Sequence, residues 1–321
     1  MSMNVICVGE MLIDFVCTDT NQGLVKGVNY VKKSGGAPAN VAACIGKLGG
    51  SASLVAAVGH DPFGEFLIQE VASYDVDITH IHTLPMSTTF AFVSLADNGD
   101  REFAFNRGAD VELVLNNSVV DKLSQHTLLH LGSATALLGG NLSDSYLALA
   151  KKAKENNNII CFDPNFRIDL WRGRETEFKR ACDVYFGMAD IVKVSDDELA
   201  LFSESADMAE GCQYFHDLGV KIVLVTLGGD GCLISQNNKQ YVVPAYEINA
   251  VDTTGAGDSF IGAMLFQMSQ NQPKDDFYAN DMKKFIEFAG KVSGLVCSKI
   301  GAMSALPTFD EVQAMTFTVK K

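Results

Sequence analysis

The sequence predicts an α/β fold in which helices cover both faces of a mostly parallel central sheet. Short apolar runs without alternation, as at 4–9 and 221–226, are typical of strands that are buried on both sides. Longer helical patterns, as at 142–155 and 282–297, separate these runs. Strands that alternate with helices in this way predict a three-layer α/β/α domain.

The expected elements follow from these patterns in chain order. The apolar runs predict strands at 4–9, 52–58, 128–131, 158–162, 191–194 and 221–226. Helical spacing predicts helices at 39–48, 142–155, 208–218 and 282–297. The apolar run 260–266 predicts one more helix, which is buried.

Two segments interrupt this alternation. Residues 15–33 are polar and contain glycine, and residues 88–107 have strand-like stretches around Asp97-Asn98-Gly99-Asp100, a hairpin signal. We expect the segments 15–33 and 88–107 to form a small β-lid over the ends of the main sheet, within a single domain that spans 1–321.

Composition limits the partners and the compartment. A formal charge of −14 argues against a nucleic-acid or anionic-membrane partner. Glu10 and Asp14 break the N-terminal apolar run, which a signal peptide would not tolerate, and no window has the roughly 18 apolar residues of a membrane span. The eight cysteines show no CxxC pair and no Cys/His cluster, so a zinc site is not expected. Scattered thiols indicate a reducing, cytoplasmic location.

The run from Asp252 to Phe260 carries the strongest chemical signal. Gly255 and Gly257 precede an apolar helix, whose first backbone N–H groups have no intrahelical partner and can bind an anion. Asp258 places a base beside this anion hole, as a hydroxyl that attacks a phosphoryl group requires. A simple helix cap is the competing interpretation, because Asp and Gly are common at helix starts.

A second motif lies upstream. Gly35-Gly36-Ala37-Pro38-Ala39-Asn40-Val41-Ala42 is followed after six residues by Gly49 and after nine more by Gly59. Together with the run 252–265, this segment resembles the two signatures of the PfkB (ribokinase-like) carbohydrate kinase family. The resemblance extends over essentially the whole chain, and residues 301–308 resemble the fructokinase branch.

The resemblance implies a ribokinase-like fold and a mechanism. It implies ATP-dependent phosphorylation of a primary hydroxyl of a sugar, fructose to fructose 6-phosphate. Asp258 would act as the general base, and the turn Gly255, Ala256 and Gly257 would form the anion hole. The implied cofactors are ATP and Mg²⁺, with K⁺ as a further candidate.

The resemblance also places residues at the sugar. Asp14 follows the first strand, where ligands of open α/β sheets bind, although an exposed loop acid is the simpler interpretation. Arg107 could bind hydroxyls or phosphate, or could be a surface arginine. Asp163-Pro164-Asn165-Phe166-Arg167 matches a family motif, with helix capping by Asp163 or Asn165 as the alternative. The implied sugar ligands are Asp14, Gly35, Gly36, Asn40, Arg107, Asn165 and Arg167.

Other positions match the nucleotide and metal sites of the family. The implied nucleotide-binding residues are Lys193, Ser195, Thr226, Gly228, Gly229, Gly231 and Gly290. Glu198 would hold Mg²⁺ through water, although Ser195 and Glu198 also fit a capping box. Ser195 and Gly290 stand where relatives often carry Asn. A monovalent cation could lie near Asp252, Thr254, Ser298 and Gly301.

Competing functions are weighed by their motifs. The sequence has no P-loop and no Gly-x-Gly-x-x-Gly after a strand, which argues against a P-loop ATPase and a dinucleotide dehydrogenase. The alternatives are another sugar kinase of the family, for 2-keto-3-deoxygluconate or ribose, and a non-catalytic sugar-binding regulator. A homodimer through the edges of the lid is a further expectation, since exposed strand edges invite pairing.

Overall fold

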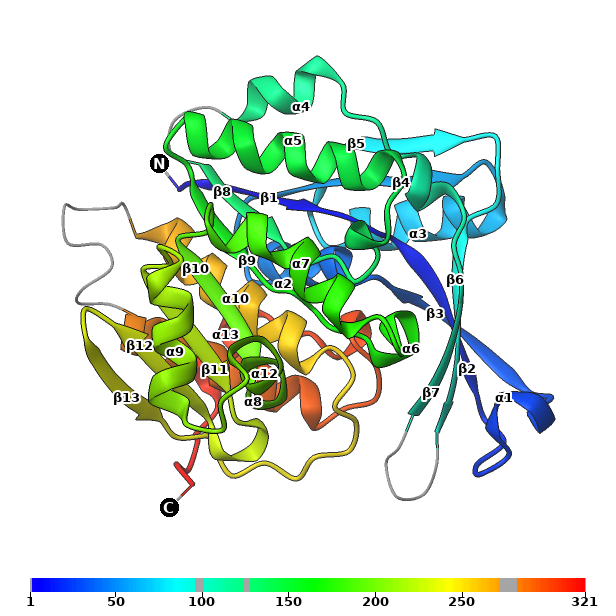
Figure 1. The fold of residues 1–321 in the computed structure, drawn as a ribbon. Helices are drawn as coiled ribbons and strands as arrows, with labels where there is room; N and C mark the ends of the chain where they lie inside the picture. The colour runs from blue at the N-terminus through cyan, green and yellow to red at the C-terminus, as the bar shows by residue number, and fades with distance from the viewer. Residues whose placement is uncertain (1, 96–100, 124–126, 272–281, 321) are drawn as a thin grey trace.

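A nine-stranded sheet forms the centre of the molecule, in the order β13–β12–β11–β10–β9–β8–β1–β4–β5 (Figure 1). The computed structural model describes residues 2–95, 101–123, 127–271 and 282–320. All neighbours from β11 to β5 are parallel, and β12 and β13 extend the sheet as antiparallel strands. The strands are β1 (Asn4–Val8), β4 (Ala52–Gly59), β5 (Asp77–Leu84), β8 (Thr127–Leu131), β9 (Ile159–Phe162), β10 (Ile191–Ser195), β11 (Ile222–Thr226), β12 (Cys232–Gln236) and β13 (Lys239–Val243).

Two apolar clusters lie on the two faces of this sheet. In β1, Val5 and Cys7 belong to one cluster, whereas Ile6 and Val8 belong to the other. This alternation explains why β1 is apolar from Val5 to Val8: both of its faces are covered. The helices therefore form two outer layers, and the predicted α/β/α class is confirmed.

The helices of the two layers come from different parts of the chain. The first layer contains α2 (Ala37–Lys47), α3 (Pro62–Ala72), α10 (Ala256–Gln270), α12 (Met282–Cys297) and α13 (Phe309–Ala314). The second contains α4 (Asn117–Lys122), α5 (Asn141–Glu155), α7 (Glu175–Phe186), α8 (Asp196–Ser203) and α9 (Met208–Asp217). Short helical turns are α1 (Gly23–Lys26), α6 (Ile168–Trp171), η1 (Ala109–Glu112), η2 (Ala136–Leu138), η3 (Gly228–Asp230) and η4 (Met303–Ala305).

A separate four-stranded sheet extends from one side of the main body (Figure 1). Its order is β3 (Tyr30–Gly35), β2 (Leu12–Cys17), β6 (Thr89–Leu95) and β7 (Arg101–Asn106). The expected lid segments supply most of it, but β2 begins at Leu12, ahead of the expected start at 15, because Leu12 already pairs with Gly35. The predicted hairpin at Asp97–Asp100 lies outside the described residues.

Aromatic side chains hold this small sheet against the main body. Phe15 stacks on Phe92 at a centroid distance of 5.2 Å and meets Phe63 of α3 edge-on at 5.8 Å. Phe63 also meets Phe90 edge-on at 5.4 Å. Aromatic pairs of this kind contribute roughly 0.5–1.5 kcal/mol each beyond their burial, so the cluster holds β2 and β6 against α3.

The predicted strands and helices agree closely with the structure. Each expected strand of the main sheet lies within one residue of its observed bounds, and four of the five expected helices lie within two residues. The helix expected at 260–266 is longer, because α10 runs from Ala256 to Gln270. The sequence patterns did not predict β5, α3, α4, α7, β12, β13 or α13. In β5, only His80 is buried, so this edge strand lacks the continuous apolar run that marked the inner strands.

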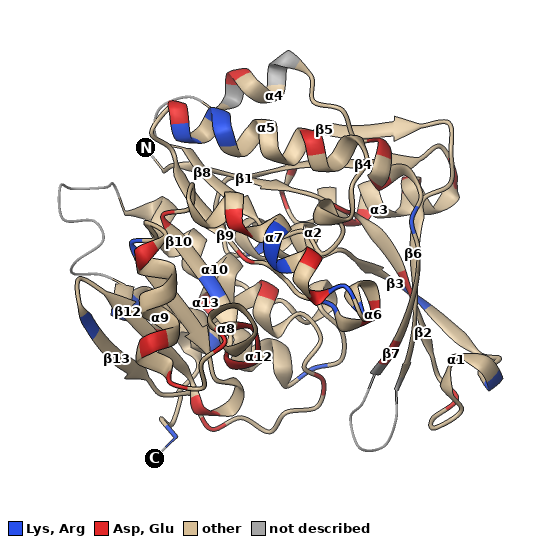
Figure 2. Cartoon of the chain, in the orientation of Figure 1, with Lys and Arg blue, Asp and Glu red and all other residues tan. Residues whose placement is uncertain are grey.

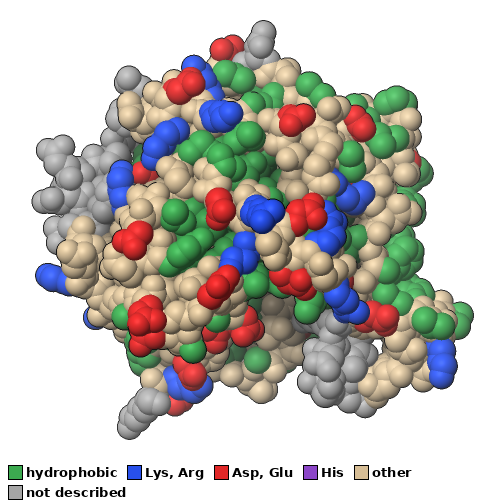
Figure 3. All heavy atoms as spheres, in the orientation of Figure 1, with side chains coloured by type: hydrophobic (Ala, Val, Ile, Leu, Met, Phe, Trp, Pro, Cys, Tyr) green, Lys and Arg blue, Asp and Glu red, His purple; other side chains and the backbone are tan. Residues whose placement is uncertain are grey.

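Charged side chains are distributed rather than clustered on the face in view. Figures 2 and 3 show acidic and basic side chains interspersed over the helices of this face. No helix of the described residues has the length and apolar character needed to cross a bilayer. Seven cysteines are buried and Cys297 is partly exposed, all with free thiols.

Candidate active site

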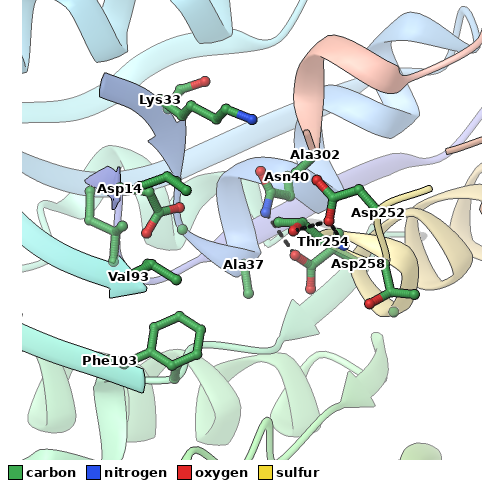
Figure 4. A pocket seen from close by; sticks show the side chains of 18 of the residues that line it. Asp14, Lys33, Ala37, Asn40, Val93, Phe103, Asp252, Thr254, Asp258 and Ala302 are labelled. Atoms are coloured by element: carbon green, nitrogen blue, oxygen red, sulfur yellow. Dashed lines mark hydrogen bonds between the residues drawn. The ribbon is translucent and has the colours of Figure 1, made fainter. Parts of the chain in front are cut away.

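A pocket of about 880 Å³ lies between the small sheet and the carboxyl ends of the central strands (Figure 4). One wall comes from β2, β3, β6 and β7, and the other from the turn before α10. The first wall is largely apolar, with Leu12, Val93 and the stacked rings of Phe103 and Phe105. Asp14 and Lys33 are charged residues of this first wall, and the other charged groups lie on the opposite wall and at the floor.

The start of α10 exposes backbone N–H groups to the pocket. Gly255 has φ +75°, and a Cβ there would lie 2.6 Å from the Cβ of Ala302, so only glycine fits. Gly257 and Asp258 follow in the first turn and line the pocket. The first N–H groups of a helix lack intrahelical acceptors and carry partial positive charge, so this turn can bind an anion.

Asp258 is bonded to a residue from the distant upstream motif. Asn40 Nδ2 donates to Asp258 Oδ2 at 2.7 Å. Burial raises the pKa of Asp258, while the Asn40 hydrogen bond and the positive charge of Arg167 oppose this rise. Asn40 Oδ1 is buried and accepts no hydrogen bond from the described residues, so it is available to a ligand hydroxyl.

The upstream motif positions Asn40 through the geometry of its glycines. Gly36 precedes α2 with φ +104°, and a Cβ there would lie 2.4 Å from the carbonyl oxygen of Glu10. Pro38 stands in the first turn of α2, where its missing N–H is not needed. Asn40 then follows on the first turn of this buried helix, with its amide in the pocket.

Asp14 lies on β2 and points into the pocket (Figure 4). Burial raises the pKa of Asp14 to about 7, although Arg167 and Lys33 lower it. A Cβ on Gly35 would lie 2.1 Å from Asp14 Oδ2. Gly35 does not line the pocket itself but leaves the space that the Asp14 carboxylate occupies.

The segment after β9 contributes three polar side chains to the pocket. Asp163 Oδ1 accepts from the N–H of Asn165, whose Nδ2 donates to the carbonyl of Gly132 at 2.7 Å. Arg167 lines the pocket and is the N-cap residue of α6, which begins at Ile168. Asp163 and Asn165 therefore do not cap this helix, and the capping alternative is wrong.

Lys193 and Asp163 form a buried ion pair at the floor. Lys193 Nζ lies 3.2 Å from Asp163 Oδ2, with side-chain exposures of 10% and 3%. Burial would lower the pKa of Lys193, but the nearby carboxylates of Asp163 and Glu198 outweigh it and raise this pKa. Lys193 is therefore held in its charged form beside the turn at Gly257.

Glu198 has a clear structural role. Ser195 Oγ accepts from the Glu198 N–H, and Glu198 Oε2 accepts from the Ser195 N–H, which is the predicted capping box. Glu198 Oε1 also accepts from the N–H of Phe166 at 2.7 Å. Burial raises the pKa of Glu198, against the opposing charge of Lys193. Neither Ser195 nor Glu198 lines the pocket.

The expected nucleotide loop lies apart from this pocket. It forms the turn between β11 and β12, where Thr226 pairs with Cys232, and Gly228 and Gly231 have φ of +54° and +115°. Lys320 Nζ donates to the carbonyl of Gly229 at 2.8 Å. Gly290 lies on α12, where a Cβ would be 3.5 Å from the ring of Tyr246.

The carboxylate of Asp252 joins two of the segments that were expected to hold a monovalent cation. Its Oδ1 accepts from Thr254 N–H at 2.9 Å, and its Oδ2 accepts from Gly301 N–H at 2.9 Å. Ser298 Oγ donates to the carbonyl of Leu295. Among the described residues there is no group of three or more His, Cys, Asp or Glu side chains arranged to hold a metal.

Arg107 is directed away from the pocket. Its Nε and Nη2 donate to Asp110 Oδ2 at 3.0 and 2.9 Å, and its Nη1 donates to the carbonyl of Gly139. Arg107 is not among the pocket-lining residues. A local carboxylate three positions along the chain therefore binds the guanidinium that was expected at the sugar.

Sequence reasoning missed two charged residues of the pocket. Glu10 is buried and accepts hydrogen bonds from Ser133 Oγ and from the N–H groups of Ala37 and Ala134. Its position just after β1 was a usable signal, because the same argument selected Asp14. Lys33 lies on β3 and lines the pocket. Its direction follows from its pairing with Asp14 on β2, which the sequence does not reveal.

This architecture, with a small sheet across a polar pocket at the end of a parallel sheet, is that of a carbohydrate kinase. The chain belongs to the pfkB family of carbohydrate kinases, since the family model matches residues 2–309. It is 34% identical over 316 residues to probable fructokinase-4 of Arabidopsis thaliana, covering 97% of this chain and 96% of the relative. It is 36% identical over 316 residues to fructokinase-1 of Oryza sativa subsp. japonica, covering 96% of each.

Solved structures give the same picture. The fold matches a fructokinase from Vibrio cholerae O395, crystallised with fructose, ADP and a calcium ion, with a TM-score of 0.85, 30% identity and 98% coverage of each chain. It also matches an aminoimidazole riboside kinase from Salmonella enterica, with a TM-score of 0.83 and 27% identity, covering 97% of this chain and 98% of the other. The fold alone therefore does not separate the sugars that these relatives use.

Proposed function

We propose that this carbohydrate kinase transfers the γ-phosphoryl group of ATP to the primary 6-hydroxyl of fructose. The observation that carries the proposal is the placement of Asp258, bonded to Asn40, beside the open turn that begins α10. Fructokinases are among the curated relatives that match nearly the whole chain, which supports fructose as the acceptor.

The sugar would bind between the small sheet and the floor of the pocket. Asp14 would accept hydrogen bonds from sugar hydroxyls, and the free Oδ1 of Asn40 would accept one more. Arg167 and Asn165 would complete the polar contacts from the other side. The apolar wall would cover the sugar and exclude water, which limits hydrolysis of ATP.

Proton transfer would fall to Asp258. Its carboxylate would take the proton from the attacking hydroxyl, and the raised pKa of Asp258 makes it a stronger base than an ordinary aspartate. The amides of Gly257 and Asp258 would stabilise the charge on the moving phosphoryl group, since they lie in the first turn of α10.

The residues at the turn that begins α10 fit a nucleoside triphosphate. Gly255, where a Cβ would meet Ala302, permits the turn that presents the N–H groups of α10, and Lys193 adds positive charge at the floor. Bound magnesium supplies charge neutralisation on the phosphates. Glu198 would reach it only through water, because both of its oxygens already accept backbone N–H bonds.

The remaining residues would serve the nucleotide, a cation and the sugar. Thr226, Gly228, Gly229, Gly231 and Gly290 would lie along the nucleotide, and Asp252, Thr254, Ser298 and Gly301 would flank a potassium ion. Arg107 would need to leave Asp110 to reach the sugar. Seven buried free thiols support a cytoplasmic location, and the exposed edges of the small sheet support a homodimer.

A panel of acceptors tests the proposal. ADP release with Mg-ATP would be measured for fructose, ribose, 2-keto-3-deoxygluconate, glucose and adenosine, and the product would be identified by NMR. Fructose should give the highest kcat/KM and a 6-phosphate product. A higher kcat/KM for ribose or ketodeoxygluconate would overturn fructose as the acceptor, and silence with every acceptor would favour a sugar-binding regulator.

A further inference from the structure

The pocket contains an excess of carboxylates over cations. Five acidic side chains line it: Glu10, Asp14, Asp163, Asp252 and Asp258. The cations that line it are Lys33, Arg167 and Lys193. A phosphoryl group that passes close to Asp258 meets a like charge, so its transfer requires positive charge on the other side.

The three cations differ in how directly they are bound. Lys193 forms its ion pair with Asp163, and Arg167 Nη1 donates to the carbonyl of Phe166 at 3.4 Å. Within the described part of the chain, Lys33 forms no close ion pair, and its charge acts on the carboxylate of Asp14, its cross-strand neighbour. Its half-buried side chain nevertheless extends into the pocket rather than into solvent.

The position of Lys33 connects the small sheet with the anion-binding turn. Lys33 pairs with Asp14 across β3 and β2, so both side chains lie on the face toward the pocket. Its Nζ lies 3.6 Å from the place that a Cβ on Gly301 would occupy. Gly301 precedes Ala302, whose Cβ would lie 2.6 Å from a Cβ placed on Gly255. Figure 4 shows Lys33 extending from β3 toward Asn40 and Ala302.

We propose that Lys33 is a catalytic residue whose ammonium group binds a non-bridging oxygen of the phosphoryl group during its transfer. This inference rests on the proposed function, since it needs phosphoryl transfer at the α10 turn. Lys33 would supply charge from the small sheet, opposite the amides of Gly257 and Asp258. No covalent bond to the lysine forms, and the proton of the sugar hydroxyl still goes to Asp258.

The neighbouring Lys32 offers a matched control. Lys32 is exposed, and its Nζ lies 3.6 Å from the ring centroid of Phe66, away from the pocket lining. Lys33→Met and Lys32→Met remove the same charge from adjacent positions of one strand. Lys33→Arg keeps the charge on a side chain of different geometry.

The test compares kcat and KM of these variants on the best acceptor. Lys33→Met should lower kcat by roughly 10- to 100-fold, as the loss of one charged transition-state contact does, with the sugar KM within about twofold. Lys33→Arg should recover part of kcat, and Lys32→Met should match the wild type. An unchanged kcat for Lys33→Met, or a raised sugar KM with normal kcat, would overturn the proposal.

A binding measurement separates this result from the choice of sugar. Calorimetry with ADP, magnesium and aluminium fluoride, a mimic of the phosphoryl group in transfer, requires no sugar turnover. The wild type should bind this mixture more tightly than ADP with magnesium. In Lys33→Met, the ratio of these two affinities should be about 10-fold smaller than in the wild type. Equal gains in both proteins would contradict the role of Lys33 even if fructose proves to be the wrong acceptor.

Discussion

Asn40 Nδ2 donates a 2.7 Å hydrogen bond to Asp258 Oδ2, across 218 positions of sequence. This bond connects the start of α2 with the start of α10, so the two sequence motifs form one site. It also stabilises the ionised form of Asp258, the form that a general base requires. The other side-chain acceptor of Asn40, Oδ1, is buried and has no hydrogen-bond partner among the described residues.

Removing this hydrogen bond should change the pH profile. In Asn40→Ala, the carboxylate of Asp258 loses a donor, so its pKa should rise further. The acidic limb of the kcat/KM profile should then move to higher pH by roughly one unit, and the sugar KM should increase. Asn141→Ala, at an exposed site on α5, is the control. An unmoved acidic limb would show that Asp258 does not set it.

Asp14 should make stability depend on pH near neutrality. Its pKa in the folded protein, about 7, exceeds the ordinary value of 3.8, so its stabilising contribution is complete below the ordinary value and is lost as pH rises through 7. Between pH 5 and 8 the wild type should therefore lose roughly 1–3 kcal/mol more stability than Asp14→Asn.

Urea unfolding at several pH values measures this difference. Asp217→Asn, on the exposed surface of α9, should follow the wild type at each pH. Parallel pH dependences for the wild type and Asp14→Asn would contradict the raised pKa of Asp14.

Gly35→Ala should impair sugar binding through Asp14. The new Cβ would lie 2.1 Å from Asp14 Oδ2, so the carboxylate must move. We expect a sugar KM raised by roughly tenfold and a stability loss of about 1–3 kcal/mol. Gly187→Ala is the control, since Gly187 has φ −65° and a new Cβ there would lie 3.9 Å from the carbonyl oxygen of Val184. A normal sugar KM in folded Gly35→Ala would argue against Asp14 as a sugar ligand.

The ion pair at the floor should matter more for stability than surface pairs do. Lys193→Met leaves Asp163 buried without its cation and should cost about 3–5 kcal/mol in urea unfolding. Adding Asp163→Asn should restore part of this loss. Lys152→Met, at an exposed pair with Glu155, should cost less than about 1 kcal/mol. Equal costs for the two lysines would refute the burial argument.

The three-layer arrangement of the fold could be predicted from the sequence. Strands such as β1 are buried on both faces, so their apolar runs identify them without knowledge of their neighbours. The edge strand β5 has a mixed pattern, and nothing local distinguished it. The motif at 252–260 likewise indicated the anion-binding turn, because glycine and helix start are local features.

Residues that depend on long-range packing could not be predicted in the same way. Lys33 reaches the pocket only because β3 pairs with β2 in a particular register. Arg107 was expected at the sugar, but Asp110 binds its guanidinium. The sequence does not show which of these two partners the guanidinium binds. Such choices depend on which groups the finished fold brings within hydrogen-bond distance.

The most direct test of the account is the kcat of Asp258→Asn with Mg-ATP and fructose. The substitution keeps the size of the side chain but removes the base, so kcat should fall by roughly 100- to 10,000-fold. The variant should unfold at or above the wild-type temperature, because a carboxylate with a raised pKa has been removed. A folded Asp258→Asn protein that phosphorylates fructose at nearly the wild-type rate would contradict the proposed mechanism.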